Sequence, residues 1–267
     1  MGRRRLARMS TVILARHGRT RANATGVLAG RTVGITLDDV GREQAGRAAA
    51  RLAGVPLAAA FTSPLERCRE TASLLLAGTG LRARVERGLN ECDYGDWAGR
   101  PMKELLKEDL WKVIQAHPAG VRFPGGESMA EMSARAVRAV RETDARVGAE
   151  HGDGAVWLAV AHGDIIKAVL ADALGMHLDA FQRIVVDPAS LSVIRYTSRR
   201  SFVLAMNTAE GSLAHLAAPQ EKPDEKLGGG SGPGTRSPAA RSRGGARAAA
   251  RTGTRSTTRS GTHRRTP

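Results

Sequence analysis

The stretch VILARHGRT, residues 12–20, begins as a run of apolar and small residues and ends on a guanidinium beside an imidazole. A short apolar run bounded by Gly is typical of a buried strand. Arg16 keeps its charge at any physiological pH, and a cation beside His17 disfavours the imidazolium, which leaves a ring nitrogen free as a nucleophile. Gly18 permits a turn or a close approach of the backbone. We therefore expect a strand over 12–15 whose carboxyl end carries chemistry.

The stretch LAVAHG, residues 158–163, repeats this pattern of an apolar run ending in His-Gly. A helical pattern follows over 164–174, with Gly175 as its stop. In open α/β sheets, ligands gather at the carboxyl ends of the strands. His17 and His162 are therefore expected to meet across neighbouring strands.

Strand-like and helix-like segments alternate along the chain, which favours an α/β fold. We predict one domain over 11–208, built as a three-layer α/β/α sandwich around a mostly parallel sheet. The predicted strands are 12–15, 57–62, 156–161, 191–196 and 202–206. The predicted helices are 39–53, 65–77, 102–115, 128–149 and 164–174. The strand at 202–206 would form a sheet edge that could pair in a dimer.

The net charge of +15 sits mainly in the two ends of the chain. Residues 1–10 contain four arginines, and residues 216–267 contain eleven Lys or Arg against three Asp or Glu. We expect 1–10 to be a disordered basic end and 219–267 a disordered tail, because Gly, Ser, Thr, Pro, Ala and Arg bury little apolar area. A function of another class, weak and accessory nucleic-acid binding, would come from this tail, which lacks aromatic residues for base stacking. An inert tail is the alternative.

Two cysteines, Cys68 and Cys92, form no disulfide framework, which favours a reducing compartment and a cytoplasmic location. Thr11 to Ala15 is too short for the core of a signal peptide. No apolar run approaches the ~20 residues of a membrane span, so we expect no membrane association.

The segment FTSPLERCRET, residues 61–71, is read as the start of a helix. Ser63 would cap it, Pro64 would take its first position and Glu66 would complete a capping box. A cation such as Arg67 is poorly placed in the first turn, unless it and the helix end bind an anion together. A solvated arginine is the alternative, and it fits Arg69.

The segment LNECDYGDWAG, residues 89–99, is read as a short strand or edge that enters a Gly-rich turn. Glu91 is a candidate proton donor, and Trp97 could form an apolar wall that raises the pKa of the acid. Two solvated acids in a polar turn are the alternative. Histidines and acids are also zinc ligands, but the neighbouring arginine and helix end favour anions, and no HxxxH or CxxC spacing is present, so we expect no metal.

These segments together resemble the histidine phosphatase superfamily, which has the phosphoglycerate-mutase-like fold, over about 11–207. RHGRTRAN is similar to its first box, SPLERCRETA to the second, LNECDYGDWAG to the acid segment and AHGD to the late histidine box. PGGES, residues 124–128, is similar to the entry of a long helix.

The resemblance implies a metabolite phosphatase that needs neither metal nor cofactor. His17 would become phosphohistidine, and Glu91 would protonate the leaving group. The phosphate would be held by Arg16, Asn23, Arg67 and His162. A phosphoglycerate-type mutase, and a domain that recognises a phosphorylated partner without turnover, are the alternatives.

The sequence departs from the family pattern at Arg19, where Glu or Gln is common. Extra cations at the mouth would favour a substrate with a second anionic group, and ordinary surface arginines are the alternative. The candidates for the substrate entrance are Arg19, Arg21, Gly30, Arg31, Thr32, Arg100 and Lys103.

Overall fold

Six strands form one mixed sheet in the computed structural model, which describes residues 10–211 and 213. The strands are β1 (Ser10–Arg16), β2 (Leu57–Thr62), β3 (Arg84–Val85), β4 (Ala155–Ala161), β5 (Leu191–Tyr196) and β6 (Ser201–Thr208). Their order is β3-β2-β4-β1-β5-β6. β3, β2, β4 and β1 are parallel, and β5 is antiparallel to both of its neighbours. The mostly parallel sheet is confirmed, and β6 forms one of its edges.

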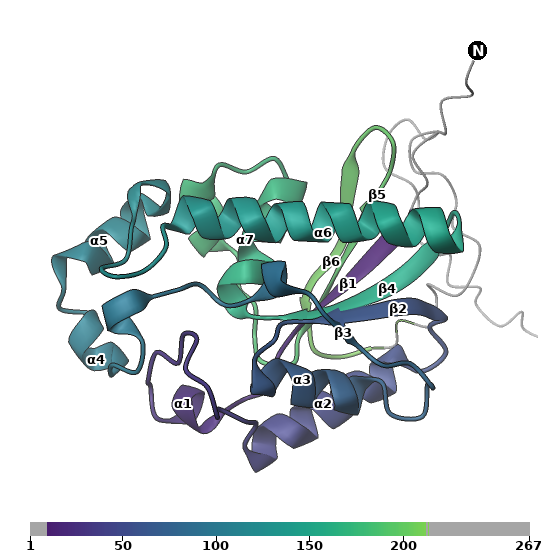
Figure 1. Cartoon of the computed structure of the whole chain (residues 1–267), viewed down its shortest axis with the longest axis horizontal. Helices are drawn as coiled ribbons and strands as arrows, with labels where there is room; N and C mark the ends of the chain where they lie inside the picture. The colour runs from purple at the N-terminus through teal and green to yellow at the C-terminus, as the bar shows by residue number, and fades with distance from the viewer. Residues whose placement is uncertain (1–9, 212, 214–267) are drawn as a thin grey trace, which may run out of the picture. The chain divides into compact units, whose positions relative to one another are not determined.

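Helices cover both faces of the sheet, so the three-layer α/β/α arrangement is confirmed. The helices are α1 (Arg21–Ala24), α2 (Asp39–Leu52), α3 (Glu66–Leu75), α4 (Met102–Leu105), α5 (Asp109–Ala116), α6 (Met129–His151) and α7 (Gly163–Ala173). Short 3₁₀ helices are η1 (Arg87–Leu89), η2 (Gly95–Trp97), η3 (Pro118–Gly120) and η4 (Leu178–Arg183). Figure 1 shows α2 and α3 below the sheet and α6 and α7 above it.

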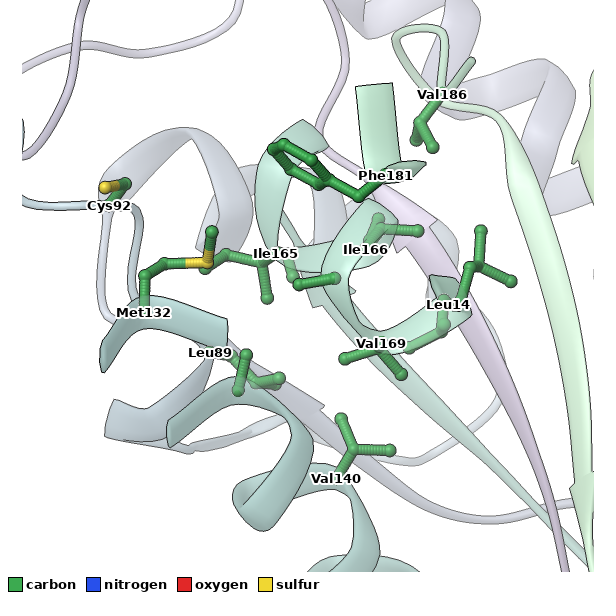
Figure 2. Packing of buried hydrophobic residues seen from close by; sticks show 14 of the residues in the cluster. Leu14, Leu89, Cys92, Met132, Val140, Ile165, Ile166, Val169, Phe181 and Val186 are labelled. Atoms are coloured by element: carbon green, nitrogen blue, oxygen red, sulfur yellow. The ribbon is translucent and has the colours of Figure 1, made fainter. Parts of the chain in front are cut away.

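The central strand β1 is apolar on both faces, and its side chains alternate between two cores, as the period of a strand requires. Ile13 and Ala15 pack in the cluster that contains α2 and α3. Leu14 packs in the cluster that contains α6 and α7. Figure 2 shows Ile166 and Val169 of α7 beside Leu14 in this second cluster. The two helical layers therefore fix β1 from both sides.

The structure corrects two of the predicted elements. The pattern over 102–115 forms two helices, α4 and α5, because the backbone at Glu108 is extended and begins a new helix. The segment 89–99 contains no strand, and two 3₁₀ helices flank an irregular stretch there. The strand β3 was not predicted, because two residues are too few to show a period.

The predicted disordered end 1–10 is wrong at Ser10, which is buried and is the first residue of β1. Residues 1–9 and the tail 219–267 lie outside the described residues, so their predicted disorder and the nucleic-acid role of the tail stay predictions. Among the helices of the described part, none has the length and apolar composition needed to span a bilayer.

Candidate active site

His17 and His162 lie side by side at the carboxyl edge of the sheet. β1 and β4 are paired in parallel with Arg16 opposite Ala161, so the residue that follows each strand reaches the same place. The two imidazole centroids are 5.3 Å apart. The structure therefore brings the two histidines together as predicted.

The two ring nitrogens of His17 differ in protonation. Nδ1 lies 2.8 Å from the carbonyl oxygen of Gly18, and a carbonyl can only accept, so Nδ1 carries the proton. Nε2 is then the atom with a free lone pair. Burial, followed by the charges of Arg67 and Arg16, holds the pKa of His17 well below its usual value. The imidazole is therefore neutral and nucleophilic at neutral pH.

Gly18 allows the turn after β1 to lie against helix α2. A Cβ on Gly18 would lie 2.4 Å from the carbonyl oxygen of Gly41, and a Cβ on Gly41 would lie 2.0 Å from the carbonyl oxygen of Arg19. Both contacts are backbone contacts, which cannot yield by rotation of a side chain. The position of His17 is thus fixed by a backbone-to-backbone contact of two glycines.

Arg16 and Arg67 supply two guanidinium groups beside the histidines. Arg67 is 1% exposed, and its Nη2 donates to the carbonyl of Gly30 at 2.8 Å. Nε and Nη1 of Arg67 and Nε of Arg16 are buried and have no hydrogen-bond partner among the described residues. Buried donors without partners are costly, so they indicate a place for an anion that would accept from them.

His162 lies between Arg67 and Ser63. Nη2 of Arg67 is 3.2 Å from Nδ1 of His162, and a guanidinium can only donate, so Nδ1 accepts. Nε2 then carries the proton and donates to Oγ of Ser63 at 2.7 Å. The predicted capping box is wrong: Pro64 lies before the helix, α3 begins at Glu66, and Leu65 at the N-cap provides no side-chain cap. The hydroxyl oxygen of Ser63 accepts from the imidazole and, at 3.4 Å, from the backbone N–H of Leu65.

Glu91 approaches the histidines from the loop after η1. Its Oε2 is 3.6 Å from Nδ1 of His162, and its Oε1 accepts from the backbone N–H of Cys92. Side chains of Arg31 and Arg135 donate to the carbonyl oxygen of Glu91 at 2.8 and 2.9 Å. The carbonyl oxygen of Glu91 thus pairs with two guanidinium groups and not with a neighbouring strand, and the predicted strand is absent here.

Glu91 holds its proton to an unusually high pH. Burial, followed by the charge of Asp164, raises the pKa of Glu91 to about 7, and the nearby Arg67 opposes this only in part. The predicted direction of this shift is therefore correct. A carboxyl group of this kind can give and take a proton near neutral pH.

A cavity of about 460 Å³ opens onto these groups. Arg16, His17, Arg67 and Glu91 line its inner end. Among the entrance candidates, only Gly30 lines it. Gly30 has φ of +52° and lies against Tyr94 and Ala98, so the chain turns sharply where its carbonyl meets Arg67.

In the part of the chain that the structure describes, the other entrance candidates do not line the cavity. Most of the cationic candidates bind carboxylates elsewhere. Arg19 pairs with Asp38, Arg31 pairs with Asp93 and Glu127, and Arg100 pairs with Glu108. Arg21 is exposed and borders a separate groove, and Thr32 and Lys103 are exposed. The expected cluster of cations at the mouth is therefore wrong.

Asn23 is on the cavity wall, but its side chain has a local partner as well. Its Oδ1 accepts from the backbone and hydroxyl of Thr20, which completes a capping box at α1. The amide nitrogen of Asn23 is the group left to face a ligand.

Residues 12–209 match the family model of the histidine phosphatase superfamily (branch 1). The chain belongs to the histidine phosphatase superfamily. It is 32% identical over 216 residues to the "Probable phosphoglycerate mutase GpmB" of Yersinia enterocolitica, which covers 79% of this chain and 97% of the relative.

Two solved structures of this superfamily fold are phosphatases by name. The alpha-ribazole phosphatase of Shigella flexneri superposes with a TM-score of 0.66 at 25% identity, covering 74% of this chain and 96% of the other. The mycobacterial glucosyl-3-phosphoglycerate phosphatase gives a TM-score of 0.65 at 28% identity, covering 75% and 99%. Membership of the superfamily and these neighbours support a phosphoryl-transfer enzyme.

Several groups of this histidine phosphatase site were missed from the sequence. Ser63 was assigned to a helix cap, although its direct position after β2 placed it at the same sheet edge as His17 and His162. Arg135 was not singled out, because it is one of several arginines on α6. Lys167 also lines the cavity, and its spacing of three residues from Asp164 on a helix was the available signal.

No group of three or more His, Cys, Asp or Glu side chains suited to a metal ion occurs within residues 10–211.

The buried Glu91 of this superfamily member should cost stability at high pH. The folded carboxyl titrates near 7 and the unfolded one near 4.5, so the folded state binds the proton more tightly and stability falls as pH rises between these values. We expect Glu91→Gln to raise the free energy of unfolding by roughly 2–3 kcal/mol at pH 8 and by much less at pH 5. Urea unfolding at the two pH values measures this.

Glu142→Gln, at an exposed position of α6, is the matched control and should change stability at neither pH. An equal free energy of unfolding for wild type and Glu91→Gln at pH 8 would show that the ionised Glu91 does not destabilise the folded state.

Proposed function

We propose that the chain is a metal-independent phosphomonoesterase that works through a phosphohistidine on His17. The observation that carries the proposal is the set of buried, unpartnered guanidinium nitrogens of Arg16 and Arg67 beside a neutral imidazole. A phosphate monoester dianion matches both the charge of the two arginines and their need for acceptors. The substrate is a small phosphorylated metabolite.

In the first step, Nε2 of His17 attacks phosphorus in line with the leaving oxygen. The N–P bond forms as the bond between phosphorus and the alcohol oxygen breaks. Glu91, protonated below about pH 7, gives its proton to that oxygen. Arg16 and Arg67 balance the charge on the other phosphoryl oxygens.

In the second step, the Glu91 carboxylate takes a proton from water while the water oxygen attacks phosphorus. The N–P bond breaks, its electron pair returns to Nε2, and inorganic phosphate leaves. A carboxyl with a pKa of about 7 is suited to both steps, because both of its forms are populated at neutral pH.

His162 and Asn23 complete the phosphate site in this proposal. Nδ1 of His162 accepts from Arg67, so it must gain a proton before it donates to phosphate. The arriving dianion supplies the negative charge that favours this uptake. The amide nitrogen of Asn23 donates to a further oxygen.

A phosphomutase is the second candidate, because a curated relative carries that name. Incubation with 3-phosphoglycerate separates the two. A phosphatase releases inorganic phosphate, whereas a mutase forms the 2-phospho isomer without net release.

The proposal is tested with p-nitrophenyl phosphate in the presence and absence of EDTA. We expect turnover that EDTA does not change. No turnover, or turnover that requires an added divalent metal, would contradict it.

The role of Glu91 predicts a dependence on the leaving group. Glu91→Gln should lower kcat/KM for an alkyl phosphate by roughly 10²–10⁴-fold and for p-nitrophenyl phosphate much less, because p-nitrophenolate leaves without a proton. For the wild type and an alkyl ester, kcat/KM should fall as pH rises above about 7, where Glu91 loses its proton. Steady-state rates from pH 5 to 9 measure both effects.

Glu91→Gln should lose this decline above pH 7. An equal loss of kcat/KM for the two substrates would show that Glu91 is not the proton donor.

We also propose a reducing, cytoplasmic compartment. Cys68 and Cys92 are both free and buried.

A further inference from the structure

We propose that the substrate is a phosphate ester of a bulky, uncharged alcohol, and that Met102 and Trp111 contact its apolar or aromatic group. This inference rests on the proposed function and adds the substrate class. It comes from the outer part of the cavity, which the phosphate chemistry does not use.

Charge balance argues against a second anionic group on the substrate. Arg16 and Arg67 match one phosphate dianion. The described residues place one further cation, Lys167, on the cavity wall. Its Nζ already has a carboxylate oxygen of Asp164 at 3.5 Å and the amide oxygen of Gln182 at 3.0 Å. A second anion would have to compete with Asp164 for this one cation.

Much of the remaining wall is apolar and aromatic. It is built by Val27, Leu28, Met102, Trp111, Ile114 and Phe123. Met102, Trp111 and Leu28 are only partly buried, although each packs on the core cluster that contains α6 and α7. Their remaining exposed surface includes the part that lines the cavity. A ligand with an apolar group would cover this surface, and a small charged one would leave it in water.

The size of the cavity agrees with such a group. Its volume of about 460 Å³ falls within the range of roughly 300–1,000 Å³ typical of pockets for drug-sized ligands. A phosphoryl group fills only the inner end. The segment with α4 and α5, which Figure 1 shows beyond the amino end of α6, supplies Met102, Trp111 and Ile114 to the cavity wall.

Three primary alkyl esters with similar leaving groups test the proposal: 3-phenylpropyl phosphate, ethyl phosphate and 3-phosphoglycerate. We expect the wild-type kcat/KM for 3-phenylpropyl phosphate to exceed that of the other two by at least about tenfold. Trp111→Ala should remove about tenfold of this preference, mainly through a higher KM for 3-phenylpropyl phosphate. Trp111→Phe should keep most of the preference.

Val113→Ala is the matched control, because Val113 is on the same helix, is 39% exposed and does not line the cavity. A wild-type preference for 3-phosphoglycerate would overturn the substrate class and leave the phosphatase standing. An unchanged preference of Trp111→Ala for 3-phenylpropyl phosphate would show that Trp111 does not contact the substrate. If none of the three esters is hydrolysed while p-nitrophenyl phosphate is, the substrate class is overturned and the phosphatase stands; if p-nitrophenyl phosphate is not hydrolysed either, the proposed function fails.

Discussion

His17→Ala should lower turnover of p-nitrophenyl phosphate by roughly 10⁴-fold or more, because it removes the atom that bonds to phosphorus. Arg16, Arg67 and Glu91 remain, so phosphate should still bind. Rapid alkaline quench of the wild type with substrate labelled in its phosphoryl group should trap a labelled protein, because the N–P bond of phosphohistidine survives in alkali, and His17→Ala should trap none. The measurements are the steady-state rate and the label retained on the chain.

His151→Ala is the matched control, because His151 ends α6 at the surface and does not line the cavity. It should keep full activity. Substantial activity in His17→Ala, with the same fold by circular dichroism, would rule out His17 as the nucleophile.

Arg67→Met should lower kcat/KM by about 10³-fold and abolish inhibition by vanadate, because it removes one of the two cations that neutralise the phosphoryl oxygens. The loss should appear in both kcat and KM, since the guanidinium contacts the ground state and the transition state. Steady-state kinetics and vanadate titration measure it.

The same change in Arg69→Met should have no effect on either quantity. Arg69 lies two residues further along α3 and is exposed. Equal effects of the two substitutions would mean that net charge, rather than a positioned guanidinium, attracts phosphate.

The positions of His17 and His162 could be predicted because they depend on strand ends. A parallel pair of strands in register carries its following residues to one edge, and the apolar runs marked both strands. Arg67 could be predicted for a similar reason, as a cation misplaced at a helix amino end.

The positions of the entrance residues could not be predicted, because they depend on which carboxylate each arginine pairs with. Arg19 pairs with Asp38 and Arg100 pairs with Glu108, and nothing in the local sequence pattern distinguishes these two arginines from unpaired ones. Ser63 shows the same limit: its hydroxyl oxygen accepts weakly from the backbone N–H of Leu65, but its shorter hydrogen bond is to the imidazole of His162, which follows β4 far along the chain.

The sheet order has a consequence for synthesis on the ribosome. β1 is made first, yet both of its neighbours, β4 and β5, come after residue 154. At about 5–20 residues per second, the strand that carries the nucleophile waits on the order of ten seconds for either partner. During that time β1 is an apolar strand with two unpaired edges, in a nascent chain that does not yet contain His162. The order of the strands therefore requires that β1 be protected during translation. Catalysis can begin only once nearly the whole domain has left the ribosome.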